Sequence, residues 1–78
     1  MPRYYFHLHN GALARDEEGR ELPDLEAARQ EAIKAARELM GEDIKEGLLR
    51  LGHRIEIGDE DGREVLMVPF AEAVMIER

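Results

Sequence analysis

The chain has 78 residues, a hydrophobic fraction of 44% and a formal net charge of −7. These values are typical of one small folded domain, which we expect to span residues 1–78. The chain contains no Cys, Ser or Thr. This composition excludes disulfides, thiolate zinc sites, Ser or Cys nucleophiles and a Walker-type phosphate loop.

The acidic charge balance limits the partners that the chain can bind. A binder of the nucleic-acid backbone needs a clustered basic face, so we expect no nucleic-acid partner. No apolar run approaches the ~18 residues of a membrane span, and the N-terminus lacks the apolar core of a signal peptide. We therefore expect a cytoplasmic, bacterial-type location, no membrane association, and a surface that suits a basic protein partner.

Residues 3–9 are rich in aromatic side chains and predict a β-strand with two distinct faces. One face carries Tyr4, Phe6 and Leu8, and the other carries Tyr5, His7 and His9. The Asn10-Gly11 pair then predicts a two-residue hairpin turn into a return strand over residues 12–15. An acidic turn over residues 16–19 follows.

A long amphipathic helix is predicted from Leu25 to near Glu46. Asp24 is suited to cap its first turn, and Gly47 is suited to end it. Gly41 marks a point where the helix could end early or bend. Three- and four-residue spacing places the following apolar residues on one stripe: Leu25, Ala28, Ala32, Ile33, Ala36, Leu39, Met40 and Ile44.

The remaining residues predict a second hairpin and a short tail. Ile55 and Ile57 alternate with polar residues on one strand, and an acidic turn over residues 58–62 follows. Residues 65–68 are apolar on both faces, which favours a central position in the sheet. Residues 70–76 predict one or two helical turns or an irregular tail.

These elements predict an α+β fold of order β-β-α-β-β, with one helix on one face of a small antiparallel sheet. A helix of ~22 residues is ~33 Å long, whereas a five-residue strand is ~17 Å long. The helix should therefore overhang the sheet, and no second helix covers the other sheet face. Both mismatches predict a homo-oligomer, most simply a two-fold dimer.

The uncovered sheet face supplies the candidate interaction residues. Tyr5, His7 and His9 give it an aromatic and polar character, and tyrosine is common at protein interfaces. Plain exposure to solvent is the alternative interpretation of the same pattern.

His7 and His9 also suggest a second hypothesis, because two imidazoles on one strand face can share a metal ion. His53 could supply a third ligand. The acidic turns lack the further ligand positions of a calcium loop. No cofactor motif is present, and a chain this short has little room for a water-excluding pocket, so we expect no cofactor and no enzymatic activity.

Several motifs resemble a family of short bacterial proteins of unknown function. They are the Met1-Pro2-Arg3-Tyr4-Tyr5-Phe6-His7 start, the Asp16–Gly19 turn, the Pro23-Asp24-Leu25-Glu26-Ala27-Ala28 helix start and Val68-Pro69-Phe70. The resemblance covers almost the whole chain. It implies a self-contained α+β domain and no particular activity.

A weaker similarity links the chain to the N-terminal domain of HicB-type antitoxins. It rests on Tyr5, residues 16–19, Pro23-Asp24-Leu25 and Glu31-Ala32. The loop that follows Pro-Asp-Leu in that family is missing here, and no DNA-binding segment is recognisable in these residues. The similarity implies a domain that neutralises a basic toxin.

The sequence thus favours a small non-enzymatic, self-associating protein-interaction domain. A HicB-like antitoxin domain and a metal-binding protein are the alternatives.

Overall fold

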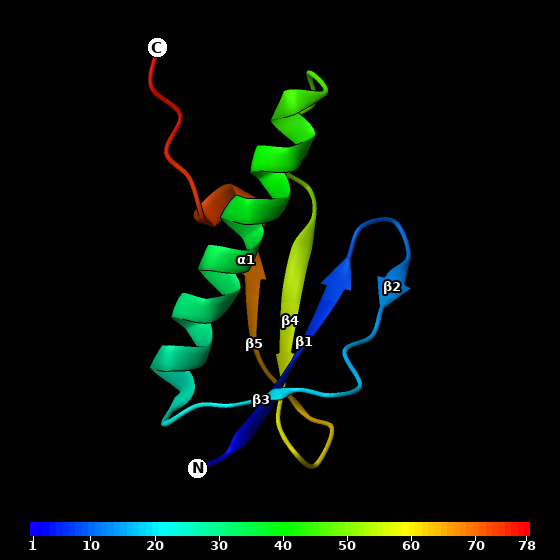
Figure 1. Ribbon diagram of the computed structural model, residues 1–78, viewed down its shortest axis with the longest axis vertical. Helices are drawn as coiled ribbons and strands as arrows, with labels where there is room; N and C mark the ends of the chain where they lie inside the picture. Colours follow the sequence, from blue (N-terminus) through cyan, green and yellow to red (C-terminus); the bar gives the residue numbers. More distant parts are fainter.

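The computed structural model describes residues 1–78 and has an α+β fold, as the sequence predicts (Figure 1). Five strands, one long helix and one 3-10 turn follow one another along the chain. They are β1 (Arg3–His9), β2 (Leu13–Ala14), β3 (Arg20–Glu21), α1 (Leu25–Lys45), β4 (Arg54–Gly58), β5 (Glu64–Pro69) and η1 (Phe70–Glu72). The single helix lies across one face of the sheet (Figure 1).

The strands form one antiparallel sheet in the order β2-β1-β4-β5. β3 pairs with the start of β1, and β2 pairs with the end of the same strand. The central pair, β1 with β4, joins segments that are far apart in the sequence, and Phe6 lies opposite Ile57. Because directly opposed residues share a sheet face, this register gathers the apolar side chains of both strands under α1.

Two sequence predictions about the strands are wrong. β5 is an edge strand, although residues 65–68 are apolar on both faces. Val68 is buried under α1, but Val65 stays exposed near the start of the strand. The first hairpin has a three-residue loop rather than a two-residue turn, because His9 pairs with Leu13 and only the glycine of the loop, Gly11, has a positive φ.

Helix α1 begins and ends where its capping residues predict. A side-chain oxygen of Asp24 accepts a hydrogen bond from the backbone N–H of Ala27 at 2.8 Å, which satisfies a free donor of the first turn. Gly47 follows the last turn with a φ of +82°, a conformation that glycine adopts at low cost. The helix continues through Gly41, so the early end that this residue could have caused is not observed. No helix combines the length and apolar character needed to cross a membrane.

The core lies between the buried stripe of α1 and the inner face of the sheet. Ala28, Ala32 and Ala36 are completely buried, and their short side chains let the helix approach the strands closely. The other buried apolar residues are Met40, Ile55, Ile57, Val68, Phe70 and Ala73. Nine residues make a small core, so the loss of any large member should be costly.

The helix stripe continues beyond the end of the sheet. Met40 is buried, but Ile44, the next member at a spacing of four, is 58% exposed. The molecule is elongated, with extents of 40 × 24 × 16 Å. In Figure 1 the C-terminal part of α1 and the C-terminal segment both rise past the strands. The predicted overhang is therefore present.

Candidate functional site

Tyr5, His7 and His9 lie on the sheet face that is turned away from α1. His7 is opposite Glu56 of β4, and Tyr5 is opposite Gly58. The rings of Tyr5 and His7 stack almost in parallel, with centroids 6.5 Å apart. The ring of His9 instead bonds to Glu56, with 2.9 Å between Nε2 and Oε1. The structure thus brings Tyr5 and His7 together and engages His9 separately.

His7 is not exposed, as a residue on an uncovered sheet face would be, because the acidic turn over residues 16–19 folds onto it. Only 6% of His7 is accessible to solvent. The backbone N–H of Asp16 donates to its Nδ1 at 3.0 Å. The turn occupies the edge of β1 between β2 and β3, where regular strand pairing is interrupted.

The carboxylate of Asp16 fixes this turn to the strand. One oxygen accepts from the backbone N–H of Phe6 at 3.1 Å, which replaces a missing strand-to-strand bond. The other oxygen accepts from the N–H groups of Glu18 and Gly19, each at 3.1 Å. Asp16 therefore satisfies three backbone donors that no strand partner reaches.

Gly19 completes the turn because no other residue fits its position. Its φ is +68°. A Cβ atom there would lie 2.9 Å from the carbonyl oxygen of Tyr4 and 2.9 Å from the Tyr5 ring. The acidic-glycine motif of the sequence is thus a requirement of packing as well as of turn geometry.

The environment of Asp16 shifts the pKa of its carboxyl group below the ordinary value of 3.8. Burial acts in the opposite direction and raises the pKa. The hydrogen bonds from the backbone N–H groups of Gly19, Phe6 and Glu18 outweigh it, since they stabilise the charged form.

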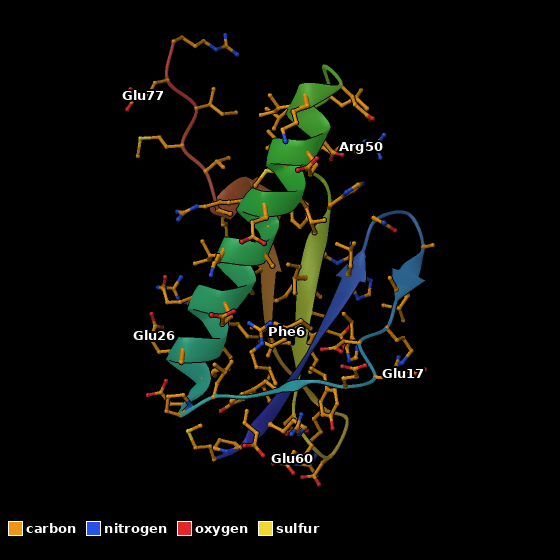
Figure 2. The ribbon with its side chains drawn as sticks, viewed as in Figure 1. Phe6, Glu17, Glu26, Arg50, Glu60 and Glu77 are labelled. Carbon is orange, nitrogen blue, oxygen red and sulfur yellow. The ribbon has the colours of Figure 1, made fainter.

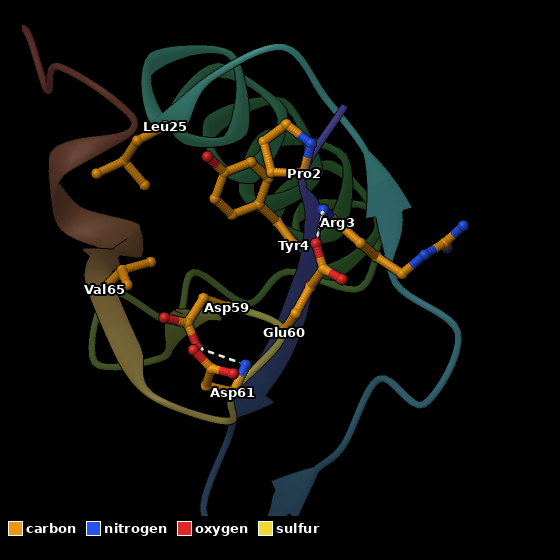
Figure 3. Close-up of a pocket in the computed structure, with 8 residues that line it drawn as sticks. All are labelled: Pro2, Arg3, Tyr4, Leu25, Asp59, Glu60, Asp61 and Val65. Carbon is orange, nitrogen blue, oxygen red and sulfur yellow. Dashed lines mark hydrogen bonds between the residues drawn. The ribbon is translucent and has the colours of Figure 1, made fainter.

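A second acidic turn joins β4 to β5 and has a related design. One carboxylate oxygen of Asp59 accepts from the N–H groups of Asp61 and Arg63, each at 2.9 Å. Glu60 accepts from the backbone N–H of Arg3 at 3.1 Å, so the turn is tied to the start of β1 (Figure 3). Figure 3 shows the turn and β1 around a shallow pocket of about 340 Å³ that Tyr4 and Leu25 also line.

The two acidic turns meet beside Tyr5 and His7. They border a shallow cavity of about 310 Å³ that is open to solvent and is lined by Tyr5, His7, Arg15, Asp16, Glu17, Asp59, Glu60 and Gly62. Figure 2 shows Glu17 and Glu60 on these turns, in the part of the molecule away from the C-terminal end of α1. The sequence contains both turns, but the pairing of β1 with β4, which brings them together, is long-range and leaves no local signal.

The histidines do not converge. His53 precedes β4, and its ring packs edge-on against Phe70 with centroids 5.6 Å apart. His7 bonds to Asp16, and His9 bonds to Glu56. No group of three or more His, Cys, Asp or Glu residues is placed to hold a metal ion. The shared metal site suggested for His7, His9 and His53 therefore has no geometric support.

An apolar groove lies at the opposite end of the molecule, between the end of α1 and the C-terminal segment. Its volume is about 300 Å³, and its lining residues are Arg37, Met40, Gly41, Ile44, Leu49, Val74, Met75 and Ile76. Arg37 holds the C-terminal segment there, because its Nε donates to the carbonyl oxygen of Ala73 at 2.7 Å. Met75 and Ile76 are 83% and 57% exposed, although both are apolar.

Comparison with known proteins gives one match. A family model described as a domain of unknown function, DUF6894, matches residues 3–71. Neither the curated proteins nor the solved structures contain a match. The matched range includes every strand and the whole of α1.

Proposed function

Because the chain belongs to the DUF6894 family, a domain of unknown function, we propose its function from its geometry: it is a protein-interaction domain that self-associates as a dimer. The interface is the apolar end of the molecule, defined here as the exposed apolar side chains at the end of α1, in the following loop and in the C-terminal segment. These side chains are Leu39, Ile44, Leu48, Leu49, Met75 and Ile76.

The observation that carries this proposal is the exposure of Ile44. Ile44 lies on the same face of the helix as the buried residues Ala36 and Met40. It is exposed because the sheet ends before it and does not cover it. Scattered exposed apolar residues are common on protein surfaces. Here Ile44, Leu49, Met75 and Ile76 line the same groove, and apolar side chains gathered in this way are typical of an interaction site.

A second copy of the chain suits this surface because the chain has both an apolar groove and exposed apolar side chains that could enter the groove of another copy. The groove beside Met40 and Gly41 can receive an apolar side chain, and Met75 and Ile76 project at its edge. A two-fold axis would use the same patch on both copies. A stable interface removes about 800 Å² from each partner, roughly one-seventh of the 5479 Å² that this chain exposes.

Sedimentation equilibrium on the whole chain tests the proposal. The unmodified chain should show a mass that rises with concentration toward twice that of one chain. Ile44→Glu or Met75→Glu should keep the mass at that of a single chain, because each buries an unpaired charge in the interface. Leu13→Glu is the matched control, since Leu13 is also an exposed apolar residue but lies on β2, outside the patch.

A single-chain mass for the unmodified protein at every concentration would contradict the proposal. Equal loss of association in the Leu13→Glu control would also contradict it, because the effect would then arise from added charge and not from the apolar end.

A further inference from the structure

His7 is the only polar side chain that is buried in the chain, and half of its hydrogen-bonding capacity is unused. Its Nδ1 accepts from Asp16, so the neutral ring carries its proton on Nε2. Nε2 has no partner in the chain, yet no fully enclosed side-chain nitrogen or oxygen lacks a partner. The Nε2–H group is therefore not fully enclosed, and His7 is one of the residues that line the cavity.

The position of Gly58 explains why this donor stays free. A Cβ atom on Gly58 would lie 3.4 Å from Nε2 of His7, and the glycine supplies no side chain that could accept the hydrogen bond. The imidazole is held on one side by Asp16 and is left with an available donor on the other. A polar ligand atom in the cavity could accept from it.

The cavity walls are strongly acidic. Asp16 and Glu17 approach from one turn, and Asp59 and Glu60 approach from the other. Arg15 is the only basic residue among the lining residues, so carboxylates outnumber cations around this space. Both carboxylate oxygens of Asp16 accept from backbone N–H groups. Asp59 and Glu60 each use one oxygen in this way and keep the other for a ligand. The exposed carboxylate of Glu17 accepts from no group in the chain.

These features select a class of ligand. The carboxylates favour a cation, and the absence of a converging group of three metal-ligating residues favours one larger than a metal ion. A guanidinium group fits best, because its planar set of donors can reach two carboxylates at once and can stack on aromatic rings. Tyr5 and His7 present stacked rings at this cavity.

We propose that the cavity between the two acidic turns binds an arginine side chain from a basic segment of a partner protein. The guanidinium group lies between the carboxylates of the two turns, and Nε2 of His7 donates to a backbone carbonyl of the same segment. This site is distinct from the apolar end of the molecule, and the proposal holds whether or not the chain self-associates.

The test is an NMR titration of the isotope-labelled chain with the peptide acetyl-Ala-Arg-Ala-Arg-Ala-amide at fixed ionic strength. Saturable shifts are expected at Tyr5, His7 and the amides of both acidic turns. The same peptide with citrulline in place of arginine keeps the shape and loses the charge, and it should not bind. Shifts spread over the whole surface, or no saturation, would overturn the proposal.

Two double variants with the same change in net charge distinguish a specific binding site from general attraction between opposite charges. Glu17→Gln with Glu60→Gln should weaken binding of the arginine peptide by about three- to tenfold, as expected for two partly exposed ion pairs. Glu38→Gln with Glu42→Gln makes the same change in net charge on α1 and should leave binding unchanged. Equal weakening by both pairs would overturn the proposal.

The folded state of each variant is checked by its amide spectrum. If dilution of the unmodified chain alone shifts the cavity resonances, the occupant is a second copy of the chain, and the proposal of a separate basic partner is wrong.

Discussion

The backbone N–H of Asp16 donates to Nδ1 of His7 at 3.0 Å, and this bond joins an acidic turn to the central strand of the sheet. The carboxylate of the same aspartate accepts from the backbone N–H of Phe6, so both the backbone and the side chain of Asp16 bind to β1. The turn thereby covers His7 and forms one wall of the cavity on the sheet face opposite α1.

Asp16→Asn should destabilise the chain by about 1–3 kcal/mol. The amide can keep one acceptor oxygen for the turn, but its NH₂ group would then face the N–H of Phe6, and that donor would lose its partner. Urea unfolding at neutral pH measures the change. Asp61→Asn is the control, because Asp61 is an exposed aspartate in the other turn, and equal losses in both variants would contradict this role for Asp16.

The lowered pKa of Asp16 predicts a loss of stability in acid. The folded chain holds the pKa of this carboxyl below the ordinary value of 3.8, so the unfolded chain binds a proton more readily. The stability that the charged carboxyl group contributes is fully present above about pH 5. It is lost as the pH falls through 3.8, the pKa in the unfolded chain, to the lower pKa in the folded chain. Urea unfolding between pH 6 and pH 3 should show a smaller acid dependence in Asp16→Asn than in the unmodified chain. An identical dependence in the two proteins would refute the assignment.

Gly19→Ala should cost more stability than Gly62→Ala. Both glycines have positive φ, which costs about 1–2 kcal/mol for alanine. At Gly19 the new Cβ would also meet the backbone of Tyr4 at 2.9 Å, whereas a Cβ at Gly62 meets nothing within 4 Å. Thermal unfolding of the two variants gives the comparison, and equal losses would show that the contact with Tyr4 is relaxed without cost.

Gly41→Ala should stabilise the chain by about 1 kcal/mol. Gly41 lies inside α1 with a helical backbone, and a Cβ at this position meets no atom within 4 Å. The gain comes from the lower flexibility of alanine in the unfolded chain. Urea unfolding at a concentration where the chain is monomeric isolates this effect. A loss of stability would indicate that α1 bends or ends at residue 41.

Self-association should strengthen when salt is added. The net charge of −7 makes two copies repel each other, and salt screens charges separated by more than about 8–10 Å. The apolar contact itself does not depend on that screening. Sedimentation at low and moderate ionic strength should therefore show a larger dimer fraction at moderate ionic strength. A dimer that dissociates in salt would point to an interface held by ion pairs.

Local signals predicted the helix and the faces of the first strand well. Asp24 and Gly47 mark the ends of α1 because capping depends on neighbouring residues alone. The alternation of residues 3–9 assigned Tyr5 and His7 to the face away from the helix, and the structure places them there.

The sequence did not predict which strands pair when they are far apart along the chain. β3 has only two residues and therefore no repeating pattern. β1 pairs over most of its length with β4, which is far away in the sequence, and only its end pairs with β2, the next strand. The meeting of the two acidic turns could therefore not be foreseen. The burial of His7 could not be foreseen either, because it depends on how the turn over residues 16–19 folds onto the ring.

An isotope-filtered NOE experiment on a mixture of labelled and unlabelled chains tests the central claim most directly. It detects contacts between copies only. We expect intermolecular NOEs among the methyl groups of Ile44, Leu49, Met75 and Ile76. Intermolecular NOEs confined to the sheet face around Tyr5, or none at a concentration well above that of the sedimentation measurements, would contradict the account.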